Sequence, residues 1–229
     1  MNPLCLAIDT SDGSAVDSLV QATHPYVGMF KVGATTFAAL GPPVVIRLAA
    51  AKPVFCDLKL NDIPSQVEGA IAALGGMDVS YATVHALGGP DMVRAAVKAA
   101  PESLKILGVT VLTSLEGADL ARLGIEGSIR ETVLRLGEMA LEAGASGLVC
   151  SGKEVALLRE RFGPTTAGGP LLVVPGIRAQ AGPSGDQQRT SGARAALDAG
   201  ADVVVVGRPI TGAADPGAAA RDILDSLTA

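Results

Sequence analysis

Three ionisable side chains lie within six residues at the end of an apolar run: Asp57, Lys59 and Asp62. The run before them, from Val54 to Cys56, has the composition of a buried strand. Alternate side chains of an extended strand share a face, so Asp57 and Lys59 are predicted to point the same way. Charge is costly to bury unless it is paired. The pattern therefore predicts paired charges at a strand end that act electrostatically on a bound ligand.

Two more charged residues accompany apolar runs: Asp9 closes the run 4–9, and Lys31 lies in the run 27–33. A single charge at a strand end is most often solvated or part of an exposed ion pair. Together with Asp57 and Lys59, however, these residues predict neighbouring opposite charges on adjacent strands. Two opposite charges about 4 Å apart attract by about 4 kcal/mol at an effective dielectric of roughly 20.

Two other polar residues have simpler interpretations. Asp12 is predicted to be a turn residue or a helix cap. His85 closes the apolar run 79–85 and either points into the site or is a neutral, hydrogen-bonded histidine, and the second interpretation is favoured.

Short apolar runs alternate with helical patterns along the whole chain. Strands are predicted at 4–9, 27–33, 53–58, 79–85, 104–112, 147–150, 171–174 and 202–206, and helices near 14–23, 34–50, 65–75, 89–99, 128–143, 152–161, 190–199 and 216–227. Strict β–α alternation predicts a parallel sheet. We therefore expect one domain over residues 1–229, an α/β fold of the (β/α)8 TIM-barrel type, with an open doubly wound sheet as the alternative.

The segments after the last two predicted strands suit a phosphate group. Pro175 and Gly176 precede Arg178 on one, and Gly207 precedes Arg208 on the other. Glycine lets the backbone approach an anion, and guanidinium groups match phosphate oxygens. A surface ion pair would explain Arg208 alone. The stretch 176–190 is predicted to be a mobile active-site loop that brings Gln180 or Gln187 to the phosphate.

Composition narrows the functional classes. Hydrophobic residues make up 48% of the chain and charged residues 18%, which argues against disorder. The net charge of −5 does not favour nucleic acid as a partner. The three cysteines have neither disulfide-scaffold nor zinc-site spacing. We see no membrane span and no signal peptide, and we expect a cytoplasmic protein.

The motifs together resemble the orotidine 5′-phosphate decarboxylase family, in particular its bacterial branch. The resemblance covers nearly the whole chain and rests on blocks in the family's order: Leu6–Asp9, Lys31–Gly33, Asp57–Pro64, Val84–Ala86 with Gly88–Gly89, Thr110–Ser114, Pro175–Arg178, Gly185–Gln187 and Gly207–Thr211. The Asp-x-Lys-x-x-Asp pattern alone is less specific, because related sugar-phosphate decarboxylases share a variant of it.

The resemblance implies a homodimeric enzyme without metal or organic cofactor, acting in pyrimidine biosynthesis. It implies that Lys59 donates the proton, that Asp57 lies beside the substrate carboxylate, that Lys31 completes the charge network, and that Asp62 serves the partner's site. The implied substrate-binding residues are Asp9 and Lys31 at the ribose, Thr113 and Ser114 near the pyrimidine, Arg178, Gln187, Gly207 and Arg208 at the phosphate, and Ile63, Gln66 and Pro175 beside them.

One position departs from the family pattern. Gln66 stands where the family usually has a threonine that contacts the ribose, so we expect a changed ribose contact with activity kept. Two rival functions stay open at this point. One is a metal-dependent sugar-phosphate decarboxylase on the same barrel. The other is a noncatalytic nucleotide-binding barrel, because fold alone does not determine function.

Overall fold

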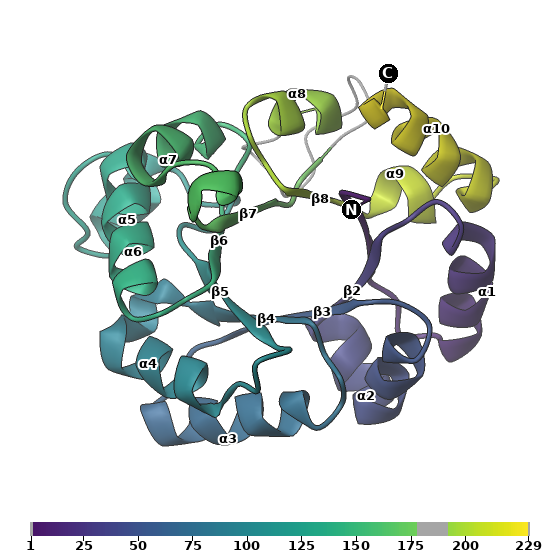
Figure 1. Ribbon diagram of the computed structural model, residues 1–229, viewed down its shortest axis with the longest axis horizontal. Coiled ribbons are helices and arrows are strands. Elements are labelled where there is room, and N and C mark those ends of the chain that lie inside the picture. Colours follow the sequence, from purple (N-terminus) through teal and green to yellow (C-terminus); the bar gives the residue numbers. More distant parts are fainter. Residues whose placement is uncertain (1, 178–191, 229) are drawn as a thin grey trace.

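Eight parallel strands close into a barrel in the order in which they occur along the chain (Figure 1). The computed structural model describes residues 2–177 and 192–228. The strands are β1 (Leu4–Ile8), β2 (Met29–Gly33), β3 (Val54–Leu60), β4 (Tyr81–His85), β5 (Lys105–Val109), β6 (Gly147–Val149), β7 (Leu171–Val174) and β8 (Val203–Val206). Pairing of β1 with β8 completes the ring, so the predicted (β/α)8 barrel is confirmed and the open sheet is wrong.

Helices surround the barrel in a single outer layer (Figure 1). They are α1 (Gly13–Thr23), α2 (Ala34–Ala49), α3 (Pro64–Gly75), α4 (Gly89–Ala99), α5 (Gly117–Arg122), α6 (Ile129–Glu142), α7 (Val155–Phe162), α8 (Ala193–Asp198), α9 (Arg208–Thr211) and α10 (Pro216–Thr228), with 3-10 turns η1 (Ala86–Gly88) and η2 (Thr165–Ala167). The last helix, α10, lies beside α1 and closes this layer. Within the described ranges, no helix has the length and apolar character that crossing a membrane requires.

Side-chain alternation along the strands builds two apolar layers. In β8, Val203 and Val205 point into the barrel, whereas Val204 and Val206 face the helices. Both faces of each strand are therefore buried, which explains why the strands are continuous apolar runs without polar alternation. The inner layer contains Cys5, Ala7, Met29, Phe55, Leu107, Val109, Val149, Val173, Val203 and Val205.

Several predicted boundaries need correction. The strand predicted at 104–112 ends at Val109, and the helix predicted at 34–50 is divided at Gly41, whose φ of 65° no L-residue adopts easily. Helix α5 was not predicted, although Glu116 and Asp119 form a capping box at its start. The start of the helix predicted at 190–199 lies partly outside the described residues, and its described part begins at Ala193.

Capping residues lie at the ends of several helices. The Asp12 side chain accepts a hydrogen bond from the Ser14 amide at 2.8 Å and caps α1, as expected for a cap residue. Asp215 accepts from the Ala218 amide at 2.9 Å at the start of α10. Gly144 and Gly200 have φ values of 98° and 106°, which end α6 and α8 before the next strands.

Candidate active site

The inner face of the barrel changes from apolar to charged toward the carboxyl ends of β1 to β3. Asp9 follows the last residue of β1, and Asp57 pairs in register with Gly33 of the neighbouring strand. Lys31 lies in the middle of β2, within the predicted run 27–33, and its long side chain carries the ammonium group up to the carboxylates. In this way three strands deliver charges to one edge, where barrel enzymes build their sites.

The four charges form one alternating chain of contacts. Lys31 Nζ lies 3.2 Å from Asp9 Oδ1 and 3.6 Å from Asp57 Oδ2, and Lys59 Nζ lies 2.8 Å from the same Asp57 oxygen. The side chains of Lys31 and Asp57 are both 9% exposed, whereas those of Lys59 and Asp9 are 37% and 55% exposed. The buried inner pair thus supports two outer charges that a ligand can reach. The predicted arrangement of opposite charges is confirmed.

The mutual contacts keep the inner pair ionised. Burial opposes the charge on Asp57, but the ammonium groups of Lys59 and Lys31 and a hydrogen bond from Thr83 outweigh it and lower the pKa of Asp57. Burial likewise opposes the charge on Lys31, yet the carboxylates of Asp57 and Asp9 raise its pKa. The buried pair of Lys31 and Asp57 is therefore ionised at neutral pH.

Gly33 makes the close approach of these charges possible. A methyl group at this position would lie 2.8 Å from Asp9 Oδ1 and 3.2 Å from Lys31 Nζ. A side chain on Gly33 would therefore occupy the path by which Lys31 reaches Asp9. Strand alternation identifies position 33 as inward-facing, but the need for glycine depends on how two neighbouring strands meet.

Lys59 has a backbone conformation that strand alternation does not predict. Its φ is 49°, in the left-handed region that non-glycine residues rarely adopt. Pairing of β3 with β4 shifts register between Cys56 and Leu60, so the strand bulges at the motif. Asp57 and Lys59 do meet, as expected, and they do so within this bulge and not in a regular flat strand.

The motif's second aspartate lies apart from the four charges in this chain. Asp62 is exposed, and its Oδ1 accepts a hydrogen bond from the Ile63 amide at 2.7 Å. Ile63 is 62% exposed, and Gln66 is exposed in the first turn of α3. These three residues thus stand on the surface beside the site and not within its charged centre.

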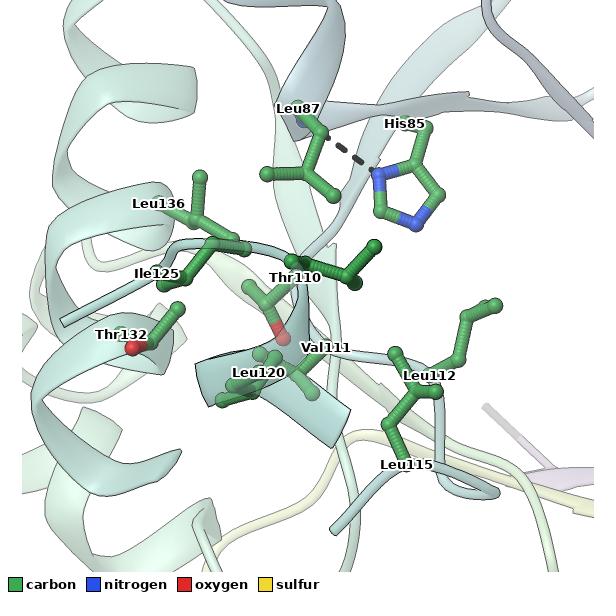
Figure 2. Close-up of a pocket in the computed structure, with 11 residues that line it drawn as sticks. His85, Leu87, Thr110, Val111, Leu112, Leu115, Leu120, Ile125, Thr132 and Leu136 are labelled. Carbon is green, nitrogen blue, oxygen red and sulfur yellow. Dashed lines mark hydrogen bonds between the residues drawn. The ribbon is translucent and has the colours of Figure 1, made fainter. Parts of the chain in front are cut away.

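A small apolar pocket lies between the end of β4, the segment after β5, and helices α5 and α6 (Figure 2). Its lining is His85, Leu87, Thr110, Val111, Leu112, Leu115, Leu120, Leu123, Ile125, Thr132 and Leu136. Thr113 and Ser114 follow in the turn after β5, where Ser114 is exposed. The apolar side chains that line the pocket pack the segment after β5 against α5 and α6. Such a lining does not suit an anionic group.

His85 matches the neutral interpretation. Its Nδ1 accepts a hydrogen bond from the Leu87 amide at 3.3 Å, which Figure 2 shows as a dashed line. Burial and the nearby Lys59 ammonium group lower the pKa of His85, so the ring is uncharged at neutral pH.

Part of the predicted phosphate site is described. Gly176 has a φ of 77°, so the turn after β7 requires glycine. It follows the half-buried Pro175, and Arg208 is exposed at the start of α9, directly after Gly207. A methyl group on Gly207 would lie 4.0 Å from Asp9 Oδ2, so this turn adjoins the charged chain. The predictions for Arg178, Gln180 and Gln187, and for most of the loop 176–190, lie outside the described residues.

Thr83 is the functional candidate that sequence reasoning missed. It lies at an inward-facing position of β4, two residues before His85, and it is fully buried. Its hydroxyl contacts both Asp57 and the Lys59 backbone. Strand alternation through Tyr81 and His85 was the available signal, because it places Thr83 on the face that bears the site.

The cysteines and metal-ligand residues of the described ranges add no second centre. Cys5, Cys56 and Cys150 are free and buried, and burial raises the pKa of the Cys5 and Cys56 thiols to about 12. No group of three or more histidine, cysteine or acidic side chains in these ranges is placed to hold a metal ion.

Comparison with known proteins agrees with this geometry. The family model described as orotidine 5'-phosphate decarboxylase / HUMPS matches residues 2–223. Orotidine 5'-phosphate decarboxylase of Anaeromyxobacter dehalogenans is 48% identical over 225 residues, which cover 98% of this chain and 97% of the relative. The enzyme of that name from Thermobifida fusca is 47% identical over 227 residues, covering 98% and 95%.

The crystal structure of orotidine 5'-phosphate decarboxylase from Lactobacillus acidophilus has the same fold, with a TM-score of 0.85 and 32% sequence identity over 100% of both chains. Sequence, fold and the arrangement of charges at the strand ends lead to one assignment: the chain belongs to the orotidine 5'-phosphate decarboxylase / HUMPS family.

Proposed function

We propose that this protein decarboxylates orotidine 5'-phosphate to uridine 5'-phosphate in pyrimidine biosynthesis. The observation that carries the proposal is the alternating chain Asp9–Lys31–Asp57–Lys59, in which one carboxylate lies 2.8 Å from the outer ammonium group. The relatives named above bear this activity in their names, and the chain covers nearly their whole length.

The chemical difficulty of this reaction lies at C6 of the pyrimidine ring. When the bond from C6 to the carboxylate breaks, the electron pair stays on C6 in an sp2 orbital outside the π system, and carbon dioxide leaves. No ring carbonyl can delocalise that pair directly, so a fixed positive charge must stabilise it. Lys59 Nζ supplies this charge and then transfers a proton to C6. Water can restore the lysine proton, because the side chain is 37% exposed.

Asp57 and Lys31 prepare that ammonium group. Asp57 Oδ2 holds Lys59 Nζ at 2.8 Å, and Lys31 compensates the buried carboxylate from the other side at 3.6 Å. Because the charges are already in place, they need little reorganisation when negative charge develops on C6. Asp57 also presents negative charge where the substrate carboxylate must lie, which favours its departure as neutral carbon dioxide.

The remaining contacts place the nucleotide around this centre. We assign Asp9, Lys31 and Gln66 to the ribose side, and Thr113 and Ser114 to the pyrimidine. Pro175, Gly207 and Arg208 form the described part of the phosphate site, and Arg178 and Gln187 complete it. Binding energy from a phosphate far from C6 can be used to hold the reacting ring against Lys59.

We also propose a homodimer in which Asp62 and Ile63 reach the partner's site. Asp62 is exposed and makes no contact with the four charges of its own chain, in the part that the structure describes. Ile63, next to Asp62, is 62% exposed, so a large apolar side chain is available beside it for contact with a partner. A cytoplasmic location is supported by the three free, buried cysteines.

The test is an absorbance assay of the purified protein with orotidine 5'-phosphate, with and without a chelator. We expect conversion to uridine 5'-phosphate at the same rate in both. Loss of turnover with the chelator and recovery with a divalent cation would instead favour the metal-dependent decarboxylase. Binding of uridine 5'-phosphate without any turnover of the substrate would favour a noncatalytic nucleotide-binding barrel.

A further inference from the structure

The hydroxyl of Thr83 makes two contacts to the motif from the neighbouring strand. Its Oγ1 donates a hydrogen bond to Asp57 Oδ1 at 3.0 Å, and it accepts one from the Lys59 amide at 2.9 Å. The threonine is fully buried, so solvent does not compete for either contact. A hydroxyl group has one proton to donate and lone pairs to accept, and here both capacities are used on two charged residues of the site.

The register between β3 and β4 explains why a side chain, and not a backbone carbonyl, accepts the hydrogen bond from the Lys59 amide. Cys56 pairs with Ala82 and Leu60 with Val84, so residues 57–59 all face the single residue Thr83. Regular ladder bonds between the two backbones are interrupted over this bulge. The threonine hydroxyl takes over the role of a backbone carbonyl for the Lys59 amide, which would otherwise lack that partner.

The two contacts act on different parts of the machinery. At Asp57, the bond to Oδ1 fixes the rotation of the carboxylate, so that Oδ2 faces Lys59 and Lys31. At Lys59, the bond to the amide supports a φ of 49°, a conformation that persists only where the surroundings enforce it. Both effects determine where the Lys59 ammonium group lies.

We propose that Thr83 is a positioning residue for decarboxylation, whose one hydroxyl orients the Asp57 carboxylate and holds the left-handed backbone of Lys59. This inference rests on the proposed function, and it adds a residue of β4 to a site built by β1, β2 and β3. Thr83 acts through Asp57 and Lys59 and needs no contact with the nucleotide.

The experiment compares Thr83→Val with Thr83→Ser. Valine keeps the shape and removes the hydroxyl, so we expect kcat for orotidine 5'-phosphate to fall by about tenfold or more, a barrier increase of about 1.4 kcal/mol. KM should change by less than about threefold, because the phosphate and ribose contacts remain. Serine restores the hydroxyl and should keep kcat within about threefold of the wild type. Valine activity within twofold of the wild type, or a serine variant as impaired as valine, would overturn the proposal.

A matched control separates positioning from general destabilisation. Thr23 is also fully buried and donates a single hydrogen bond to the Leu19 carbonyl at 2.7 Å in α1. Thr23→Val should leave kcat unchanged even if it lowers the melting temperature. Thr83→Ala serves as a second hydroxyl-free variant in case valine does not fold. If neither hydroxyl-free variant folds, Thr83 is a folding residue and the proposal is wrong.

A crystal structure of unliganded Thr83→Val gives a readout that does not depend on turnover. We expect the 2.8 Å contact between Lys59 Nζ and Asp57 Oδ2 to open, or the Lys59 backbone to leave the left-handed region. An unchanged site would contradict the positioning role. Failure of the wild-type protein to decarboxylate the nucleotide would count against the proposed function, whereas this structure tests Thr83 alone.

Discussion

Lys59 combines three properties that a proton donor to a carbanion needs. It is held at 2.8 Å by a buried carboxylate, it is partly open to solvent, and its backbone is kept in one unusual conformation. The first property fixes its position, the second allows reprotonation, and the third reduces the conformations that the side chain can sample. Asp57 provides the first property, exposure to solvent the second, and Thr83, which bonds the Lys59 amide, the third.

The first prediction concerns the charge itself. Lys59→Ala should lose most of the turnover and keep the fold, because the residue lies at the rim of the barrel and not in either apolar layer. The measurement is kcat together with a circular dichroism melt. Lys105→Ala, at the exposed amino end of β5, is the matched control and should retain full activity. Turnover of Lys59→Ala within about tenfold of the wild type, a barrier change under about 1.4 kcal/mol, would refute the role.

A second prediction at this scale concerns pH. The pKa of Asp57 is lowered from 3.8 in the folded protein, so its ionised form stabilises the fold above that value. This contribution is lost as pH falls through the lower folded pKa. The difference in the free energy of unfolding between wild type and Asp57→Asn should therefore be large at neutral pH and shrink at about pH 3. Urea titrations at both pH values measure it, and a difference independent of pH would contradict the charge pairing.

At the scale of elements, the short strand β6 shows how barrel packing places small residues beside large ones. Gly147 lies in register between Leu107 of β5 and Leu171 of β7. A methyl group there would lie 2.4 Å from the Leu171 carbonyl oxygen and 3.0 Å from Leu107 Cδ2. The backbone of β7 and the side chain of Leu107 therefore leave no room for a side chain at position 147 in this closely packed interior.

We therefore predict that Gly147→Ala lowers the free energy of unfolding by about 1–3 kcal/mol, the usual range for overpacking a core. Gly117→Ala is the control, because nothing lies within 4 Å of a methyl group at that position in α5. It should be neutral or slightly stabilising, since alanine favours helix over glycine. Denaturant unfolding measures the free energy of unfolding of both variants. If Gly147→Ala is as stable as Gly117→Ala, the backbone of β6 adapts to the added methyl group without cost.

At the scale of the whole molecule, the barrel concentrates its chemistry at one end. The interior below the charges is filled by aliphatic, sulfur-containing and aromatic side chains, and the charged chain begins where that layer ends. A low-dielectric floor strengthens the electrostatic contacts above it. The surface beside the site bears Asp62 and the exposed Ile63, which are available to a second copy of the chain.

The last prediction tests that second copy. If Asp62 serves the partner's site, Lys59→Ala and Asp62→Ala subunits should each be inactive alone. When the two are co-expressed in equal amounts, half of the dimers contain one subunit of each kind, and each such dimer has one intact site of its two. The mixture should therefore recover about a quarter of wild-type activity. Lys59→Ala co-expressed with Asp57→Ala is the control, since both changes disable the site of their own subunit. If the Lys59→Ala and Asp62→Ala pair stays as inactive as this control, Asp62 does not act across subunits.

The sequence by itself determined the order of the strands and helices, a parallel sheet for which a closed barrel was favoured over an open one, and the charges that gather at the carboxyl ends of its strands; the pairing of β1 with β8 in the structure decided the closure. These features follow from local information: apolar periodicity over a few residues, helix caps such as Asp12, and charges that end apolar runs. Helix α5 is the main element that this local information does not predict, because its six residues are too few to show a helical apolar period.

Only the tertiary structure decided how the charges are held. The bulge at residues 57–59, the left-handed Lys59 and its partner Thr83 depend on the register between β3 and β4, whose contacting residues lie 24 and 26 positions apart in the chain. The requirement for Gly33 likewise arises from the approach of Asp9 and Lys31 across two strands. Such constraints follow from the distances between side chains brought together by folding, and periodicity along a single strand does not contain them.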